Sequence, residues 1–296
     1  MASLAAAAQP NILFIAVDDL RDTLGCYGNA AVKTPNIDRL AARGVVFERA
    51  YVQYPVCNPS RVSFLTGLRP DQTGVTDNNT LLRDKLPDVV TFPQVLRENG
   101  WHAAAFGKIT HLGGGRNAAL KAKWMDLPKS WHSAEAFEAT ATGRRKLAGR
   151  DLSGGKLNWC HWGAMDGDDD DQPDGQIASA VIAKMEALGD QPWIIGCGFM
   201  KPHDPFVAPA KYFDLYPEGS HQLRRWRSVL ARSAKCSASS PTPSAWSSCA
   251  PTMPAPRSWM RRWVVCSTRW TGSSSLTARW SSSSATTAII WARALG

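Results

Sequence analysis

Cys57 begins the stretch of this sequence that is best suited to nucleophilic chemistry on an anion. Pro59 follows two residues later, Arg61 two residues after that, and a short apolar run ends at Gly67. Proline is tolerated in the first turn of a helix, where its missing N–H costs nothing, so the pattern predicts a helix that begins at the cysteine. The free N–H groups of a helix N-terminus attract anions, and the guanidinium of Arg61 matches a tetrahedral oxyanion. Without these neighbours, Cys57 would more simply be a small buried hydrophobic residue.

Two adjacent carboxylates follow the first apolar run of the chain. Residues 11–17 are continuously apolar after Asn11, as is typical of a buried parallel strand, and Asp18 and Asp19 come directly after them. In α/β sheets, ligands bind beyond the carboxyl ends of the strands. Adjacent oxygen donors also suit a hard divalent cation. The alternative interpretation is a helix cap beside a solvated acid.

Two lysine–histidine pairs follow later apolar runs. Lys108 and His111 come after one such run, and Lys201 and His203 come after another. Both runs predict buried strands, and the carboxyl ends of parallel strands lie at one edge of a sheet. We therefore expect these side chains at the same edge. Taken singly, they would be surface lysines and loop histidines.

Hydrophobic periodicity predicts strands that alternate with helices, as in an α/β fold. Residues 112–175 show no clear period and are expected to be irregular. The aspartate run at 166–171 is expected to be a solvated loop, because its spacing does not match the calcium loop of an EF-hand. The predicted strands cover 11–17, 45–52, 101–106 and 192–199, and the predicted helices cover 34–43, 91–99 and 176–188.

Together these motifs resemble those of type I sulfatases. Cys-x-Pro-Ser-Arg at 57–61 and Leu-Thr-Gly at 65–67 are similar to the signature of that family, and residues 100–111 are similar to its second signature. Lys-Pro-His at 201–203 resembles the iduronate-2-sulfatase-like branch. The motifs occur in the order found in that family. The resemblance implies an alkaline-phosphatase-like α/β fold, in which helices flank a mostly parallel sheet.

The resemblance also implies a modified residue and a metal ion. In type I sulfatases a maturation enzyme oxidises the signature cysteine to formylglycine, whose hydrate is the nucleophile, and Cys57 stands at that position. Asn58 departs from the family, in which a small residue is more usual at this place. By the same resemblance, Asp18, Asp19 and the converted Cys57 would bind Ca²⁺.

The remaining site residues take their expected roles from the resemblance. Arg61, Lys108 and Lys201 would stabilise charge on the sulfuryl oxygens. His111 would hold the formylglycine hydroxyl, and His203 would protonate or hydrogen-bond the leaving oxygen. The substrate would be a sulfate monoester of a sulfated saccharide, such as iduronate 2-sulfate, and the protein partner would be the formylglycine-generating maturation enzyme.

The charged residues divide the chain into two unlike parts near residue 220. All 25 acidic residues lie at or before Glu218, whereas residues 219–296 contain 11 of the 34 basic residues, no acid and 7 of the 13 tryptophans. An ordinary domain mixes both signs of charge. We therefore expect a remnant of a signal peptide or a disordered segment at 1–9, an incomplete sulfatase catalytic domain at 10–223, and a basic tail at 224–296.

The basic tail predicts either disorder or a change of reading frame. Its serines and lack of acids favour disorder, but tryptophan is rare in disordered tails. In a frame shifted by one base, residues 252–273 can encode a helix-like segment and residues 285–293 can encode a motif similar to the Asp-His metal motif of sulfatases. We therefore expect that one base was lost near codon 223, in the genome or in sequencing. An irregular tail, an incomplete calcium site and an inactive chain would follow.

Two other functions remain open from the sequence. A phosphoester or phosphonate hydrolase of the alkaline phosphatase superfamily would need similar residues. A non-enzymatic product could bind nucleic acid through its basic tail, without sequence specificity. No apolar run approaches the ~18 residues of a membrane span, so none is expected. The alanine-rich start predicts an exported protein, periplasmic or extracellular.

Overall fold

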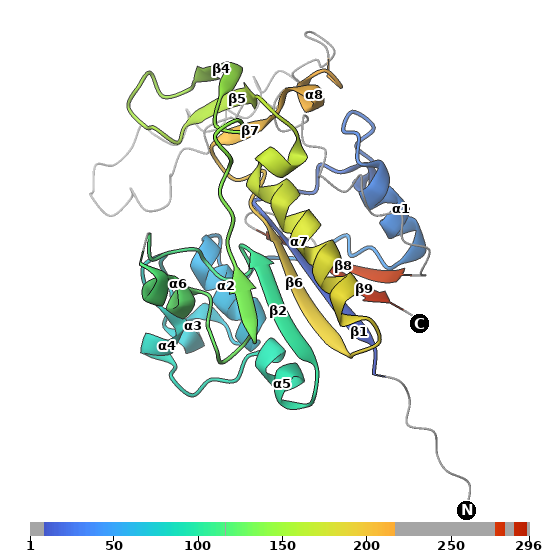
Figure 1. The fold of residues 1–296 in the computed structure, drawn as a ribbon, viewed down its shortest axis with the longest axis vertical. Helices are drawn as coiled ribbons and strands as arrows, with labels where there is room; N and C mark the ends of the chain where they lie inside the picture. The colour runs from blue at the N-terminus through green and yellow to red at the C-terminus, as the bar shows by residue number, and fades with distance from the viewer. Residues whose placement is uncertain (1–8, 116, 217–275, 282–286, 295–296) are drawn as a thin grey trace, which may run out of the picture.

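A six-stranded sheet lies at the centre of the protein (Figure 1). The computed structural model describes residues 9–115, 117–216, 276–281 and 287–294. The strand order is β3-β2-β6-β1-β9-β8, in which the first four strands are parallel and the last two run antiparallel to their neighbours. The expected mostly parallel α/β fold is therefore confirmed. The strands are β1 (Asn11–Asp18), β2 (His102–Gly107), β3 (Ser133–Glu135), β6 (Trp193–Phe199), β8 (Leu276–Ser281) and β9 (Thr287–Ala294).

The central strands β1 and β6 are apolar because both of their faces are covered. They pair in parallel from Ile12↔Ile194 to Val17↔Phe199, and every residue of β6 is buried. Continuous apolar runs are typical of parallel strands that lie between two helical layers. The three strands predicted from such runs at 11–17, 101–106 and 192–199 are confirmed, each to within one residue of its expected ends.

Helices pack on both faces of the sheet and produce two hydrophobic cores. Leu13 and Val17 of β1 cluster with Ile177 of α7 on the face that α1 and α7 cover. Phe14 clusters with Leu65 of α2 on the opposite face, where α5 also packs. Successive side chains of a strand point to opposite faces, so one apolar strand contributes to both cores. These helices are α1 (Pro35–Arg43), α2 (Cys57–Thr66), α5 (Phe92–Glu98) and α7 (Pro173–Leu188).

A smaller sheet, in the order β4-β5-β7, lies beyond the carboxyl ends of the parallel strands (Figure 1). Residues 112–175 supply two of its strands, so the expectation that this segment is irregular was wrong. Its strands are short, and β4 is exposed at every residue, so it lacks the apolar alternation that a pattern search detects. The other elements are η1 (Gly25–Tyr27), α3 (Pro70–Thr73), α4 (Leu82–Lys85), α6 (Ala118–Trp124), β4 (Lys146–Asp151), β5 (His161–Met165), η2 (Asp169–Asp171), β7 (Phe206–Pro209) and α8 (Ala210–Phe213).

The strand predicted at 45–52 is wrong. This segment forms a single bridge and turns, and its apolar side chains Val45 and Phe47 are 53% and 44% exposed. Apolar residues alone predicted the strand, but Glu48 and Arg49 interrupt them.

Part of the basic tail forms strands, which differs from the irregular tail expected from the sequence. β9 pairs with β1 from Asn11↔Ala294 to Asp18↔Thr287. β-Branched and aromatic residues, as in Thr-Ala-Ile-Ile-Trp at 287–291, favour a strand even without alternation. The signal-peptide remnant, apart from Gln9, and the helix-like shifted segment at 252–273 lie outside the described residues. Within the described ranges, no helix has both the length and the hydropathy needed to cross a membrane.

The carboxyl ends of β2 and β6 approach so closely that two glycines are required. Gly107 has a φ of 74°, and a Cβ there would lie 2.3 Å from the carbonyl oxygen of Gly198. A Cβ on Gly198 would lie 2.3 Å from the carbonyl carbon of Lys108. The Lys108 amide donates to the Gly198 carbonyl over 2.8 Å. This contact fixes the backbone of Lys108 beside the end of β6.

Candidate active site

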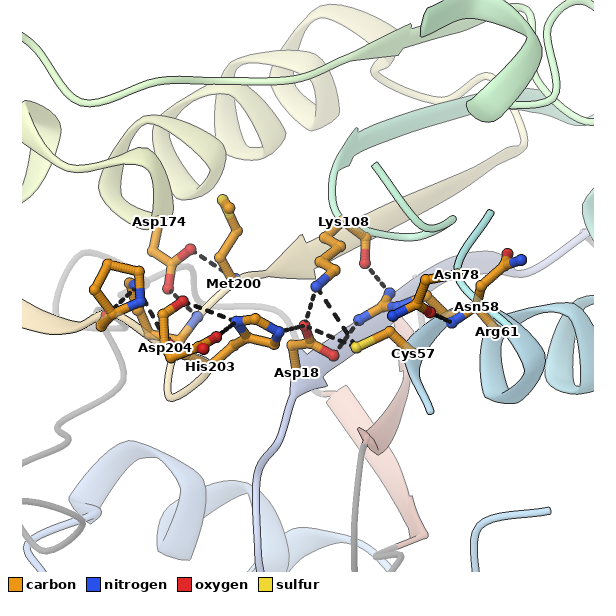
Figure 2. Close-up of polar contacts among 12 residues, drawn as sticks. Asp18, Cys57, Asn58, Arg61, Asn78, Lys108, Asp174, Met200, His203 and Asp204 are labelled. Carbon is orange, nitrogen blue, oxygen red and sulfur yellow. Dashed lines mark hydrogen bonds and ion pairs between the residues drawn. The ribbon is translucent and has the colours of Figure 1, made fainter. Parts of the chain in front are cut away.

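Five side chains meet at the carboxyl edge of the sheet (Figure 2). Asp18 is the last residue of β1, Lys108 follows β2, and His203 lies in the turn after β6. Cys57 is the first residue of α2, and Arg61 lies one turn further along that helix. We call these five residues the Asp18 cluster. All five were expected from the sequence: Asp18, Lys108 and His203 because parallel strands bring their carboxyl ends together, and Cys57 and Arg61 from the motif at a helix start.

Asp18 carries the negative charge at the centre of the cluster. Its Oδ1 accepts a hydrogen bond from Nη2 of Arg61 at 2.9 Å, and its Oδ2 pairs with Nζ of Lys108. Asp18 and Arg61 are both fully buried. Burial alone would raise the pKa of Asp18, but the positive charges of Arg61 and Lys108 outweigh burial and hold this pKa at about 2. The carboxylate is therefore ionised at physiological pH.

Arg61 also holds the chain that follows β2. Its Nη1 donates to the carbonyl oxygens of Lys108 and, over 3.1 Å, of Ile109. Its Nε is buried and has no hydrogen-bond partner among the described residues. Through its Nη1 bonds, the guanidinium therefore fixes the position of Lys108.

Cys57 lies against the carboxylate of Asp18. Its Sγ is 3.9 Å from Oδ2 of Asp18 and 3.8 Å from Nζ of Lys108. Helix α2 begins at Cys57, as predicted, with Pro59 in its first turn. Burial, followed by the negative charge of Asp18, raises the pKa of the Cys57 thiol, and Lys108 offsets this only in part. As translated, Cys57 is therefore a neutral thiol at physiological pH.

His203 presents one ring nitrogen to the cluster. Its Nε2 lies 4.0 Å from Oδ2 of Asp18. Its Nδ1 lies 2.8 Å from the carbonyl oxygen of Asp204 and 2.5 Å from Oδ1 of the same residue. Both of these oxygens are acceptors, so Nδ1 carries a hydrogen and Nε2 is the nitrogen available to a ligand. Asp204 was not expected from the sequence, although it directly follows His203.

The turn after β6 is held by Lys201 and Asp174. Nζ of Lys201 donates to the carbonyl oxygens of His203 at 3.1 Å and Pro205 at 2.5 Å, so its expected contact with sulfate stays a prediction. Burial lowers the pKa of Lys201 to about 8. The carboxylate of Asp174, in the first turn of α7, accepts the N–H groups of Met200 at 2.8 Å and Lys201 at 3.0 Å. Asp174 was not expected from the sequence, in which its only distinguishing feature is that it follows Pro173 at the start of a helix.

Asp19 and His111 lie beside the cluster. Asp19 has a φ of 56°, which is uncommon for a residue other than glycine. Burial, followed by the negative charge of Asp18, raises the pKa of Asp19 to about 6. The ring of His111 packs edge-on against Trp124 at 5.6 Å, and its Nδ1 is buried without a partner among the described residues. Burial and then Lys108 lower the pKa of His111 to about 4, so this ring is neutral at pH 7.

Asn58 connects α2 to a neighbouring loop. Its side-chain amide donates to the carbonyl oxygens of Asp77 and Thr80, each at 2.8 Å. Its backbone N–H donates to Oδ1 of Asn78 at 3.0 Å. The departure from a small residue at this position therefore ties the loop to the start of the helix.

The potential metal ligands in the cluster are of three different types. Among the residues that the structure describes, Asp18, Cys57 and His203 offer an oxygen, a sulfur and a nitrogen that all lie within 4.8 Å of one another. Calcium takes six to eight oxygen ligands. Asp19 would add a second carboxylate, but two carboxylates supply too few oxygens for calcium, and the other two donors are sulfur and nitrogen. The described donor set, as translated, therefore does not fit calcium.

Solved structures place this fold among the alkaline-phosphatase-like hydrolases. A phosphonate monoester hydrolase of Agrobacterium radiobacter has a TM-score of 0.57 and 22% identity, with 71% of this chain and 44% of that chain covered. The phosphonate monoester hydrolase of Silicibacter pomeroyi has a TM-score of 0.52 and 26% identity, with 69% and 44% covered. The class that these structures define is therefore an alkaline-phosphatase-like α/β fold, and the Asp18 cluster lies at the carboxyl ends of its parallel strands.

The sulfatase family model matches residues 10–254, so the chain belongs to the sulfatase family. Iduronate 2-sulfatase of Mus musculus is 39% identical over 218 residues, which is 70% of this chain and 37% of the relative. The Homo sapiens enzyme of the same name is 38% identical over 218 residues, which cover 70% of this chain and 38% of the relative. A sulfatase of Formosa agariphila is 35% identical over 236 residues, which cover 74% of this chain and 44% of the relative. This chain thus spans less than half the length of these relatives.

Proposed function

We propose that this site serves the hydrolysis of sulfate monoesters, with residue 57 supplying the nucleophile. The observation that carries the proposal is the meeting of Cys57, Arg61 and Lys108 around one buried carboxylate. Membership of the sulfatase family supports sulfate ester chemistry. Similarity to iduronate 2-sulfatases supports a sulfated sugar, such as iduronate 2-sulfate, as the substrate. Export to the periplasm or the outside of the cell is part of the same proposal.

Conversion of Cys57 to formylglycine by a maturation enzyme is the second part of the proposal. A neutral, buried thiol is a weak nucleophile, because the thiolate is the reactive form. Hydrated formylglycine would supply a hydroxyl nucleophile at the same place. The start of α2 suits either group, because the partial positive charge of a helix N-terminus favours a developing anion.

The other residues of the site take roles that follow from their contacts. Arg61 and Lys108 would offset the charge of the sulfuryl oxygens, which is the larger part of catalysis on an anion. Nε2 of His203 would protonate or hydrogen-bond the leaving oxygen, while Asp204 holds Nδ1–H. The neutral ring of His111 would hydrogen-bond a hydroxyl at residue 57. Lys201 would orient the turn, and would reach sulfate only by leaving its two carbonyl partners.

Calcium belongs to this proposal only as part of a fuller ligand set. Asp18, Asp19 and the oxygens of a converted residue 57 would provide part of that set. Because the described donors as translated do not fit calcium, we assign no step to it. We propose instead that the chain as translated is inactive, because a shifted frame after codon 223 has removed the remaining ligands.

Two versions of the protein test this function. The chain as translated and a version with one base restored near codon 223 would each be made with a formylglycine-generating enzyme. We expect mass spectrometry to find formylglycine in the peptide that contains Cys57, and turnover of 4-nitrophenyl sulfate only in the restored version. Cys57→Ala in that version is the matched control and should abolish turnover. Full activity with an unmodified thiol would overturn the formylglycine mechanism.

A second candidate function is hydrolysis of phosphonate or phosphate esters. The similarity to the Silicibacter pomeroyi phosphonate monoester hydrolase favours it. The same restored protein would be assayed on the monoester 4-nitrophenyl phenylphosphonate and on 4-nitrophenyl phosphate. A higher kcat/KM on either of these than on the sulfate ester would replace our proposal with this one.

A further inference from the structure

We propose that the unconverted form of this chain binds Zn²⁺, or a cation of similar softness, through Asp18, Cys57 and His203. This site would differ from the expected calcium site in its ion, in its sulfur and nitrogen ligands, and in its use of His203. It concerns the cysteine as translated, so it does not depend on the proposed sulfatase activity.

The ligand types are those that zinc takes in proteins. Zinc binds cysteine sulfur, histidine nitrogen and carboxylate oxygen, and catalytic sites have three protein ligands with one position open to water. Oδ2 of Asp18 lies 3.9 Å from Sγ of Cys57 and 4.0 Å from Nε2 of His203. Tetrahedral bonds of about 2.0–2.3 Å place ligand atoms roughly 3.3–3.7 Å apart. The two separations from Oδ2 therefore need to shorten by less than about 1 Å, and all three ligand atoms already lie within 4.8 Å of one another.

His203 already has the orientation of a metal-binding histidine. Histidines that bind metals almost always donate their other ring N–H to a carboxylate or a carbonyl group, which fixes the tautomer and aims the free nitrogen. Nδ1 of His203 has both kinds of partner in Asp204, at 2.5 Å and 2.8 Å. Nε2 is thereby left facing the sulfur and the carboxylate.

Asp18 is held in the same manner. Arg61 binds Oδ1, so Oδ2 is the oxygen directed at Cys57 and His203. Lys108 competes for that oxygen, because its Nζ pairs with Oδ2. A bound cation would displace Lys108 from Oδ2. Cys57 would bind as the thiolate, so its proton would be released to solvent as the Zn–S bond forms.

The test uses the full-length chain made without a maturation enzyme. Cobalt(II) would serve as a spectroscopic probe for zinc, because a cobalt–thiolate bond produces a charge-transfer band in the near ultraviolet, and zinc affinity would be measured by calorimetry. We expect one such band, which Zn²⁺ abolishes and an excess of Ca²⁺ does not. Cys57→Ala should remove the band, and His203→Ala should weaken binding at least tenfold.

Two variants separate binding from loss of fold. Asp204→Asn should lower zinc affinity by about 10–100-fold, the usual effect of losing a partner of a metal-bound histidine. Lys108→Met should instead raise zinc affinity, because it removes the competing cation, and a misfolded protein would not show this gain. The double variant Cys160→Ser/His161→Ala is the matched control, because it removes an adjacent cysteine and histidine that lie outside the Asp18 cluster. Its zinc affinity should equal that of the wild type. A band that persists in Cys57→Ala, or a loss of affinity in Lys108→Met, would overturn the proposal.

Discussion

Replacing Arg61 with methionine should lower the free energy of unfolding by about 3–5 kcal/mol at pH 7. Arg61 and its partner Asp18 are both fully buried, and their charged groups are 2.9 Å apart. Removal of one member of a buried ion pair typically costs about 3–5 kcal/mol, and Asp18 would keep, among the described residues, only Lys108 as a charged partner at hydrogen-bond distance. Methionine fills similar space without a charge, so packing should contribute little to the loss.

Part of this loss should depend on pH. The pKa of Asp18 is about 2 in the folded protein and 3.8 ordinarily, a difference that corresponds to about 2 kcal/mol of stability. Because the folded-state pKa is the lower one, this stabilisation is present above pH 3.8 and is lost as the pH falls through about 2. Arg61 and Lys108 share it. The bonds from Arg61 to backbone carbonyls do not titrate, so their loss costs roughly 1 kcal/mol each at any pH.

Urea denaturation in the presence of a chelator would measure both parts. With a slope near ~2 kcal/mol/M, the midpoint for Arg61→Met should fall by about 2 M at pH 7. The difference from wild type should be smaller at pH 3, because Asp18 of the variant then takes up a proton. Arg69→Met is the matched control, since Arg69 is exposed and pairs with Asp71 at 3.1 Å, and it should cost under ~1 kcal/mol. Equal losses at pH 7 and pH 3 would refute the reasoning.

Three further predictions concern the residues around the cluster. Gly198→Ala should lower the midpoint of thermal unfolding, because its Cβ would lie 2.3 Å from backbone after β2; wild-type stability would show that the strands separate without cost. Asp174→Asn should speed hydrogen exchange of the two amides that its carboxylate accepts after β6, and unchanged protection at both would contradict this. Arg83→Lys should cost about 2 kcal/mol in urea denaturation, because lysine cannot form both 2.7 Å bonds to Asp126; a loss under about 0.5 kcal/mol would disprove it.

The sequence predicts the strands that are buried on both faces of the sheet. Continuous apolar runs identified β1, β2 and β6, because strands between helical layers are rarely interrupted by polar residues. The start of α2 was predictable from Pro59, whose fixed φ suits a first helical turn. With parallel strands assumed, Asp18, Lys108 and His203 had to lie at one edge.

The features that the sequence did not predict depend on contacts distant in the chain or on weak local patterns. Asp174 meets the turn after β6 only because α7 packs beside that strand. Asp204 is next to His203, but nothing in its type shows that it holds Nδ1 rather than facing solvent. Residues 45–52 had the apolar composition of a strand but form a single bridge and turns. β4 pairs with β5, but its sequence lacks the apolar alternation that is typical of a strand.

The burial of Cys57 restricts the order in which its modification and the folding of the chain can occur. Cys57 is only 7% exposed, and seven of the other nine residues of α2 are also buried. An enzyme that modified this cysteine would need access to its Sγ, which the folded helix does not give. Modification therefore has to precede folding or wait for α2 to detach. The yield of modified protein would then depend on the rate of modification relative to the rate at which α2 folds onto the sheet. Molecules that fold first would keep an unmodified thiol at Cys57.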